Sequence, residues 1–219
     1  MTASELYTND LLPLRTTDTG ADALEVMHEF YVQHLPIVND GELLAIVSED
    51  DVLEHDVERA LGEYATSLPQ LRIRTADHLY EVMRTVAQYD LTAVPVVEAD
   101  GRYVGLITAA DLLNYYARTA TFTENGSIVI LEVQRRDYAL SEIARIAESE
   151  NAIILSSFVE ASGDGSLLQV TIKVNHENVA GMLNTFQRFG YEVQATFNEG
   201  EALDSMRERY DALMNYLSV

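Results

Sequence analysis

Leu35-Pro36-Ile37-Val38 and Val94-Pro95-Val96-Val97 are the two stretches that decide the fold, because they are copies of one pattern 59 positions apart. The same offset relates Arg15-Thr16-Thr17-Asp18 to Arg74-Thr75-Ala76-Asp77. Self-similarity at a fixed period indicates a repeated structural unit. The first half of the chain is therefore predicted to contain two copies of one unit.

The first copy is predicted to form a helix, a β-hairpin and a second helix. Apolar residues recur at helical spacing over 22–32, and Pro36 cannot continue that helix, so a strand is expected to follow. Asn39-Asp40-Gly41 is typical of a hairpin turn, where glycine can adopt a positive φ. Ser48 can then cap a helix expected over 49–60.

The second copy repeats this order, with a helix expected over 78–89 and strands over 94–98 and 103–107. Neither copy is large enough to bury its apolar face alone, so the two are expected to pack together. The predicted boundaries are 1–118 for the domain, with its copies at about 6–60 and 65–118.

Each copy ends in an apolar strand followed by the pattern Ser/Thr-x-x-Asp. The pattern is Ser48-Glu49-Asp50-Asp51 in the first copy and Thr108-Ala109-Ala110-Asp111 in the second, where Gly105 precedes it. Two such units over about 6–118 resemble a pair of CBS (cystathionine-β-synthase-type) motifs, known as a Bateman module. The resemblance implies two clefts that bind an adenosine nucleotide: AMP, ADP, ATP or S-adenosylmethionine, with Mg²⁺ as a companion of a polyphosphate.

The chemistry of such a cleft can be described from residue types. A strand that leads into a helix presents unpaired N–H groups, which can hold a phosphate. A hydroxyl can donate to a phosphate or ribose oxygen, an aspartate one turn later can accept from the ribose hydroxyls, and apolar residues can sandwich the adenine. By resemblance, the first cleft combines Leu12, Val32 and His34 with Thr108 and Asp111, and the second combines Leu71, Leu91 and Ala93 with Ser48 and Asp51.

Two alternatives to ligand binding apply to these residues. Ser/Thr followed by Asp three residues later is also a helix-capping arrangement. The Ser48 cleft departs further from the pattern, because Ala45 stands where Gly105 stands in the other copy, and Glu49 and Asp50 add negative charge beside any phosphate. A less charged adenosyl ligand, or a metal-chelated polyphosphate, would tolerate that charge better.

Three basic side chains near the clefts also admit two interpretations. His34 could face a phosphate or serve a structural role. Arg15 and Arg74 could bind phosphate, but at matching repeat positions the favoured interpretation is ion pairing with Asp18 and Asp77.

The pattern changes after a polar, Thr-rich stretch over 119–126, which is predicted to be a linker. Strands and helices then alternate in the order βαββαβ, the ferredoxin-like plan, so the fold class is α+β. The expected strands are 127–133, 152–159, 167–174 and 192–197, and the expected helices are 138–150 and 177–189.

This second domain, over 127–198, is similar to an ACT domain, and the whole layout resembles the acetoin-utilisation type of CBS/ACT regulatory protein. ACT domains commonly bind amino acids with a Gly-containing loop after the first strand. Here that loop, 134–139, has no glycine. An assembly or degenerate role is therefore favoured over amino-acid binding.

A final helix is predicted over 201–217, with a heptad-like apolar stripe of Leu203, Met206, Tyr210, Leu213 and Leu217. The stripe is expected to pack on its own subunit or on a partner. Because CBS pairs commonly associate face to face, a homodimer is predicted.

Composition excludes several classes of function. Fourteen Lys and Arg against 36 Asp and Glu give a net charge of −22, which disfavours nucleic acid and anionic membranes as partners. The absence of cysteine excludes disulfides and thiolate chemistry, and no signal sequence or spanning segment is evident, so a cytoplasmic protein is predicted. The five histidines lack metal-ligand spacing and no catalytic motif is present, so we predict no metal site and no enzyme.

The leading functional hypothesis is a regulatory module that binds an adenosyl nucleotide and transmits its presence to the ACT-like half or to a regulated partner protein of unknown identity. The alternative is an interaction or scaffold protein with vestigial clefts and a role in dimerisation. An enzyme with an unrecognised acid/base pair is the third.

Overall fold

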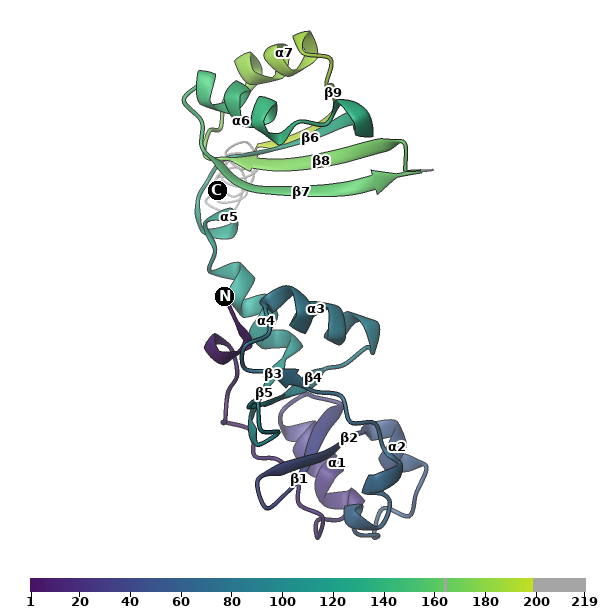
Figure 1. Ribbon diagram of the computed structural model, residues 1–219. Coiled ribbons are helices and arrows are strands. Elements are labelled where there is room, and N and C mark those ends of the chain that lie inside the picture. The colour runs from purple at the N-terminus through teal and green to yellow at the C-terminus, as the bar shows by residue number, and fades with distance from the viewer. Residues whose placement is uncertain (164, 199–219) are drawn as a thin grey trace, which may run out of the picture. The chain divides into compact units, whose positions relative to one another are not determined.

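The computed structural model describes residues 1–163 and 165–198 of the chain (Figure 1). The chain divides into two compact units, Met1–Tyr116 and a second unit that begins at Ala117. The helix predicted over 201–217, with its apolar stripe, lies outside the described residues. Within the described ranges, no helix is long and apolar enough to cross a membrane.

The first unit contains two copies of a helix–hairpin–helix unit, which confirms the predicted repeat. Short 3-10 helices η1 (Ala3–Glu5), η2 (Leu61–Glu63) and η3 (Ala65–Ser67) lie in the segments that lead into the copies. The first copy contains α1 (Gly20–Glu29), β1 (His34–Asn39), β2 (Glu42–Ser48) and α2 (Glu49–Leu53). The second contains β3 (Ile73–Arg74), α3 (Leu79–Gln88), β4 (Ala93–Val97), β5 (Tyr103–Thr108) and α4 (Ala109–Ala117).

The two hairpins share one register. His34 pairs with Ser48 across β1 and β2, and Ala93 pairs with Thr108 across β4 and β5. Each hairpin also has a bulge at the equivalent place, after Ile37 in one and after Val96 in the other. The sequence repeat is therefore a repeat of backbone geometry as well as of residue type.

The helix expected over 49–60 is shorter than predicted, because α2 ends at Leu53. The residues that follow serve α1 instead: the carbonyls of Val57 and Arg59 accept hydrogen bonds from the N–H groups of Ala21 and Gly20. A helix start leaves such N–H groups without intrahelical partners, so this tertiary contact competes with continuation of α2.

The segment that leads into each copy bonds to the other copy. Near the N-terminus, the Ala3 N–H donates to the Asp77 carbonyl. At the start of the second copy, the N–H groups of Leu61 and Gly62 donate to the carbonyls of Asp18 and Thr16. The copies are thus interlocked by exchanged segments.

The apolar cores show the same interlocking. The cluster around Leu35, Ile37 and Leu61 includes Leu106 of the second copy, and the cluster around Val94 and its neighbours includes a residue of β2, Ile46. These buried side chains are removed from water only when both copies are folded together, so the two copies are expected to unfold as one cooperative unit.

The second unit has the ferredoxin-like order. It contains β6 (Ser127–Gln134), η4 (Arg135–Asp137), α6 (Leu140–Ser149), β7 (Ile154–Ser162), β8 (Leu167–Val174), α7 (Ala180–Arg188) and β9 (Glu192–Asn198). Its antiparallel sheet has the strand order β7-β8-β6-β9. This is the βαββαβ topology predicted from the sequence, and the fold is α+β with an ACT-like second unit.

Helices α6 and α7 cover one face of this sheet (Figure 1). Ile143 and Phe186 of these helices pack on Val129, Val170 and Ile172 of the strands, and all five are fully buried. The period-2 alternation of β6 places its odd-numbered apolar residues on this face.

The stretch predicted as a linker is partly helical. Helix α5 (Ala120–Thr123) lies within 119–126, and its Thr121 Oγ1 donates to the Leu155 carbonyl of β7 at 3.4 Å. The polar, Thr-rich composition therefore did not reveal a segment that is attached to the second unit by this contact.

Candidate functional site

The junction between β5 and α4 is built by Thr108 and Asp111. The Thr108 N–H and Oγ1 donate to Asp111 Oδ2 at 2.9 and 2.7 Å, and the Asp111 N–H donates back to Thr108 Oγ1 at 3.0 Å. This is a reciprocal capping arrangement at the start of a helix. Both side chains are half-buried.

The junction between β2 and α2 has the same arrangement. The Ser48 N–H and Oγ donate to Asp51 Oδ2, and the Asp51 N–H donates to Ser48 Oγ at 3.0 Å. The capping interpretation of Ser/Thr-x-x-Asp therefore describes both copies.

Capping does not use the whole carboxylate. In each copy the cap is made by Oδ2, and among the described residues no hydrogen bond reaches the Oδ1 atoms of Asp51 and Asp111. A carboxylate oxygen can accept two hydrogen bonds. Each aspartate can therefore cap its helix and accept hydroxyl groups from a ligand at the same time.

The strand register determines which predicted residues adjoin each junction. His34 is the cross-strand partner of Ser48, and Ala93 is the partner of Thr108. The sequence-based grouping placed His34 with Thr108 and Ala93 with Ser48. Within each hairpin, strand pairing therefore places His34 opposite Ser48 and Ala93 opposite Thr108. His34 also bonds to Thr92, whose carbonyl accepts from the Ala109 N–H next to Thr108, so its grouping with the Thr108 junction stays a prediction.

Between the junctions lies a polar seam that the sequence-based reasoning did not include. Thr92 Oγ1 accepts from the Gln33 N–H at 2.7 Å, and the Thr92 carbonyl accepts from the Ala109 N–H at 2.9 Å. In the first copy, the Gln33 carbonyl accepts from the Glu49 N–H at 2.9 Å. Gln33 and Thr92 are equivalent positions, 59 apart, and this equivalence was the signal that could have identified them.

His34 is bonded to the same seam. Its Nδ1 accepts a hydrogen bond from the Thr92 N–H at 3.2 Å. A backbone N–H can only donate, so Nδ1 carries no proton, and the proton of the neutral ring is on Nε2. His34 therefore presents a neutral N–H donor beside Ser48.

A cavity of about 260 Å³ lies at this place. The cavity lies between the Ser48 junction of the first copy and the end of α3 in the second copy. Its lining residues are Gln33, His34, Ser48, Glu49, Asp50, Tyr89 and Asp90.

Four of the apolar residues predicted to contact the adenine differ widely in exposure. Val32, Leu91 and Ala93 are 6%, 6% and 1% exposed and belong to the cores, whereas Leu12 is 76% exposed. Its neighbour Leu11 is the residue that packs inward, at 4% exposed. The apolar positions were assigned by resemblance to the CBS motif, and residue type at those positions does not distinguish a core residue from a cleft wall.

Leu71, the remaining apolar prediction, is half-buried and packs against the core of the second copy. It is the predicted wall residue of the Ser48 cleft that keeps partial exposure.

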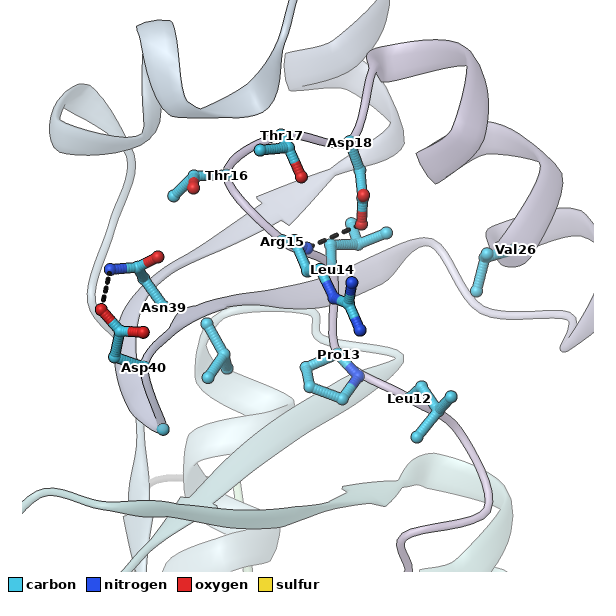
Figure 2. Close-up of a pocket in the computed structure, with 12 residues that line it drawn as sticks. Leu12, Pro13, Leu14, Arg15, Thr16, Thr17, Asp18, Val26, Asn39 and Asp40 are labelled. Atoms are coloured by element: carbon cyan, nitrogen blue, oxygen red, sulfur yellow. Dashed lines mark hydrogen bonds between the residues drawn. The ribbon is translucent and has the colours of Figure 1, made fainter.

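A larger cavity of about 800 Å³ lies in the first copy, between the segment before α1 and the hairpin turn (Figure 2). Arg15 lines it, and the Arg15 N–H donates to Asp18 Oδ2 at 2.7 Å. Arg74 N–H donates in the same way to Asp77 Oδ2 at 2.8 Å. The prediction of ion pairs was wrong in detail: the aspartates bind the backbone of each arginine, and neither pair is among the ion pairs of the described residues.

The loop that follows β6 in the second unit is filled by η4. The Arg135 N–H donates to the Ser166 carbonyl, and Arg135 Nε donates to the Gly165 carbonyl at 2.8 Å. The loop is thus attached to the β7–β8 hairpin.

In the described part of the chain, no group of three His, Asp or Glu side chains is placed to hold a metal ion. The Mg²⁺ suggested with a polyphosphate would therefore depend on the ligand for most of its coordination.

Acidification is expected to destabilise the protein through His34. Burial lowers the pKa of His34 from 6.5, and the nearby Asp51, Asp90 and Asp50 oppose this shift without reversing it. Below pH 6.5 the unfolded state therefore binds more protons at His34 than the folded state does. The contribution of neutral His34 to the free energy of unfolding is complete above pH 6.5 and is lost as the pH falls towards the lowered pKa.

The matched variant is His34→Asn, because the amide oxygen can accept the Thr92 N–H but does not titrate. Urea unfolding at pH values from about 7.5 to about 5.5 should show a steeper loss of stability in the wild type than in the variant. Parallel pH profiles would contradict the assignment.

The first unit is similar in sequence to known proteins. The CBS domain family matches residues 3–58 and 67–118. The magnesium transporter MgtE of Thermus thermophilus is 31% identical over 108 residues, which are 49% of this chain and 23% of the transporter. A homoserine O-acetyltransferase of Methanosphaera stadtmanae is 25% identical over 121 residues, 52% of this chain and 24% of that protein. This chain thus spans about a quarter of the length of these relatives.

Solved structures with similarity to the chain also match about half of it. A CBS domain pair/ACT domain protein of Thermotoga maritima has a TM-score of 0.47 and 19% identity, covering 53% of this chain and 96% of that one. CBSX2, in complex with AMP, has a TM-score of 0.47 and 24% identity, covering 53% and 96%. A putative acetoin utilization protein, AcuB, of Vibrio cholerae has a TM-score of 0.47 and 26% identity, covering 53% and 90%.

Two interlocked helix–hairpin–helix copies, each with a capped Ser/Thr-x-x-Asp junction at the head of its second helix, define a tandem-repeat module with a shared polar seam. The first half of the chain belongs to the CBS domain family and forms a CBS domain pair, and an ACT-like unit follows it.

Proposed function

We propose that this CBS pair is a regulatory module that binds an adenosine nucleotide at the junction of Thr108 and Asp111. The observation that supports it most is the half-used carboxylate of Asp111, whose Oδ2 caps α4 while Oδ1 has no hydrogen bond among the described residues. The two hydroxyls of a ribose are adjacent donors, and one carboxylate oxygen can accept from both.

The surroundings of this junction suit an anionic ligand. Helix α4 has nine residues, and its first turn contains Ala109 and Ala110, so Asp111 is the only acidic residue there. The N–H groups at a helix start favour a nearby negative charge. A phosphate attached to the bound ribose can therefore be accommodated near α4.

Ligand binding at this place can influence both copies. The Thr92 carbonyl bonds to the first residue of α4, while its hydroxyl and N–H bond to Gln33 and His34 of the first copy. A ligand that binds one arrangement of this seam more tightly will shift the protein towards it. The ACT-like unit or a partner protein is the proposed receiver of that shift.

Mass spectrometry of small molecules released from freshly purified protein tests the proposal, and AMP is the first candidate because its single phosphate suits the one helix start at this junction. Thermal unfolding with AMP, ADP, ATP and S-adenosylmethionine provides the second readout. Stabilisation by at least one of them is expected from linkage. No bound nucleotide and no stabilisation would favour the alternative, a scaffold with vestigial clefts.

We also propose that the chain forms a homodimer through the CBS pair. Leu53 and Leu113 are equivalent positions of the two copies, and their side chains are 60% and 71% exposed. Tyr31 and Tyr80 add exposed apolar surface, at 93% and 67%. Exposed apolar groups at matching repeat positions are typical of an association surface.

The double variant Leu53→Asp, Leu113→Asp is expected to be monomeric at micromolar concentration, where the wild type is expected to be dimeric by light scattering. Two charges per chain in an apolar contact would each leave a desolvated carboxylate. Leu140→Asp, on the exposed side of the second unit, should leave the mass unchanged. A monomeric wild type would overturn the proposal.

A further inference from the structure

The two junctions of the CBS pair have equivalent strand pairing and capping bonds but carry different numbers of acidic side chains. Their hairpin registers and capping bonds are equivalent. Between the capping residues, however, the first copy has Glu49 and Asp50 where the second has Ala109 and Ala110. The side chains at these two positions are therefore a candidate source of any difference between the ligands of the two junctions.

The charge at the Ser48 junction is concentrated on its cavity. Glu49, Asp50 and Asp90 all line the 260 Å³ cavity, and Asp51 is hydrogen-bonded to Ser48, which also lines it. Asp90 follows α3 of the other copy, so the acidic side chains come from both copies. A phosphate dianion in this space would face several carboxylates at short range, and each such contact is repulsive.

The groups that could compensate are weak at this place. Helix α2 has only five residues and three acidic side chains in its first turn, so its N–H groups give little attraction for a phosphate. His34 lines the cavity as a neutral ring with its proton on Nε2, since Nδ1 accepts from the Thr92 N–H. It offers a hydrogen bond without a positive charge.

The same features suit a ligand without negative charge. The His34 Nε2–H is a donor, Ser48 and Asp51 provide oxygen acceptors, and Tyr89 provides an aromatic wall. Ribose hydroxyls and an adenine ring can use these groups, and a positively charged substituent would be attracted by the carboxylates.

We infer that the two clefts select ligands by charge: the Thr108 cleft takes the anionic nucleotide, and the Ser48 cleft takes a neutral or cationic adenosine derivative and rejects phosphate. This inference rests on the proposed function, because it assumes that both junctions bind adenosine. The occupancy of the two clefts would then depend on the concentrations of two related metabolites instead of one.

The test uses S-adenosylmethionine, adenosine and AMP as probes of increasing negative charge, with binding to the full chain measured by calorimetry. Asp111→Asn removes the ribose acceptor of the Thr108 cleft, so binding to this variant reports on the Ser48 cleft. Asp51→Asn removes the acceptor of the Ser48 cleft, so binding reports on the Thr108 cleft. In Asp111→Asn, AMP is expected to bind at least about tenfold more weakly than adenosine, as one or two uncompensated charge contacts would produce. In Asp51→Asn, AMP should bind at least as tightly as adenosine.

Variants that remove the acidic pair from the Ser48 junction, or add it to the Thr108 junction, test selection by charge independently of nucleotide binding itself. Adding Glu49→Gln and Asp50→Asn to Asp111→Asn should raise the affinity for AMP about tenfold and leave that for adenosine unchanged. Adding Ala109→Glu and Ala110→Asp to Asp51→Asn should lower AMP affinity by a similar factor. Thermal unfolding of each variant without ligand confirms that it is folded.

Each outcome decides one question. If wild-type protein binds none of the three probes, the proposed function fails, and the inference fails with it. If the probes bind but AMP and adenosine have equal affinity in Asp111→Asn, or these charge variants leave their ratio unchanged, selection by charge is wrong while the nucleotide-binding function stands.

Discussion

Replacing Asp111 with alanine is expected to abolish the rise in melting temperature that AMP causes in the wild-type protein. The carboxylate is the proposed acceptor for the ribose hydroxyls, and burying those hydroxyls without a partner would cost about 1 to 3 kcal/mol for each lost bond. At a ligand concentration of about 100 times Kd, wild-type stabilisation is about 2.7 kcal/mol, which corresponds to several degrees of melting temperature. Differential scanning fluorimetry with and without AMP measures this difference.

The matched control is Asp51→Ala. Both substitutions break the same reciprocal cap, so each should lower the ligand-free stability by about 1 kcal/mol. Only Asp111→Ala should lose the AMP-dependent rise. An unchanged rise in Asp111→Ala, or its loss in both variants, would mean that the Thr108 junction is not the AMP site.

Gly105→Ala is expected to destabilise the first unit by about 2 to 4 kcal/mol, because a side chain at this position has no space. A Cβ there would lie 2.6 Å from the Thr8 carbonyl oxygen and 2.6 Å from the Tyr7 ring. Thr8 also exchanges two backbone hydrogen bonds with Leu106, which fix the N-terminal segment against β5. The substitution must therefore displace the N-terminal segment from β5. Urea unfolding gives the change in stability.

Gly101→Ala is the comparison for this variant. Gly101 has a φ of +90°, and a Cβ at this position would have no atom within 4 Å, so alanine there meets backbone strain alone, at about 1 kcal/mol. Equal losses in the two variants would show that the N-terminal segment does not pack against β5 as described.

The repeat could be predicted because it is carried by local signals. The prolines Pro36 and Pro95, the turn at Asp40-Gly41 and its partner Asp100-Gly101, and the two Ser/Thr-x-x-Asp patterns each specify a local backbone feature. In the second unit, alternation in β6 and helical spacing in α6 gave the βαββαβ order for the same reason.

Tertiary contacts were not predictable in this way. Helix α2 ends early because Val57 and Arg59 bond to the start of α1, a contact that no local pattern announces. The pairing of His34 with Ser48 and of Ala93 with Thr108 depends on strand register, which the sequence pattern did not specify.

The burial of the predicted apolar site residues was also not evident from the sequence. Val32, Leu91 and Ala93 have the residue types of a cleft wall, but interlocking of the copies places them in the cores. The seam residues Gln33 and Thr92 were missed because their role depends on two polar contacts between copies. The repeat equivalence of Gln33 and Thr92 is visible in the sequence, but the contacts between them form only when the two copies are assembled.

A crystal structure of the full chain grown with AMP tests the central claim most directly. The account predicts a bound nucleotide at the β5–α4 junction, with the ribose hydroxyls within hydrogen-bond distance of Asp111 Oδ1 while Oδ2 keeps its bonds to Thr108. A crystal structure at saturating AMP in which protein side chains close this junction, or in which the nucleotide is bound elsewhere, would contradict the account.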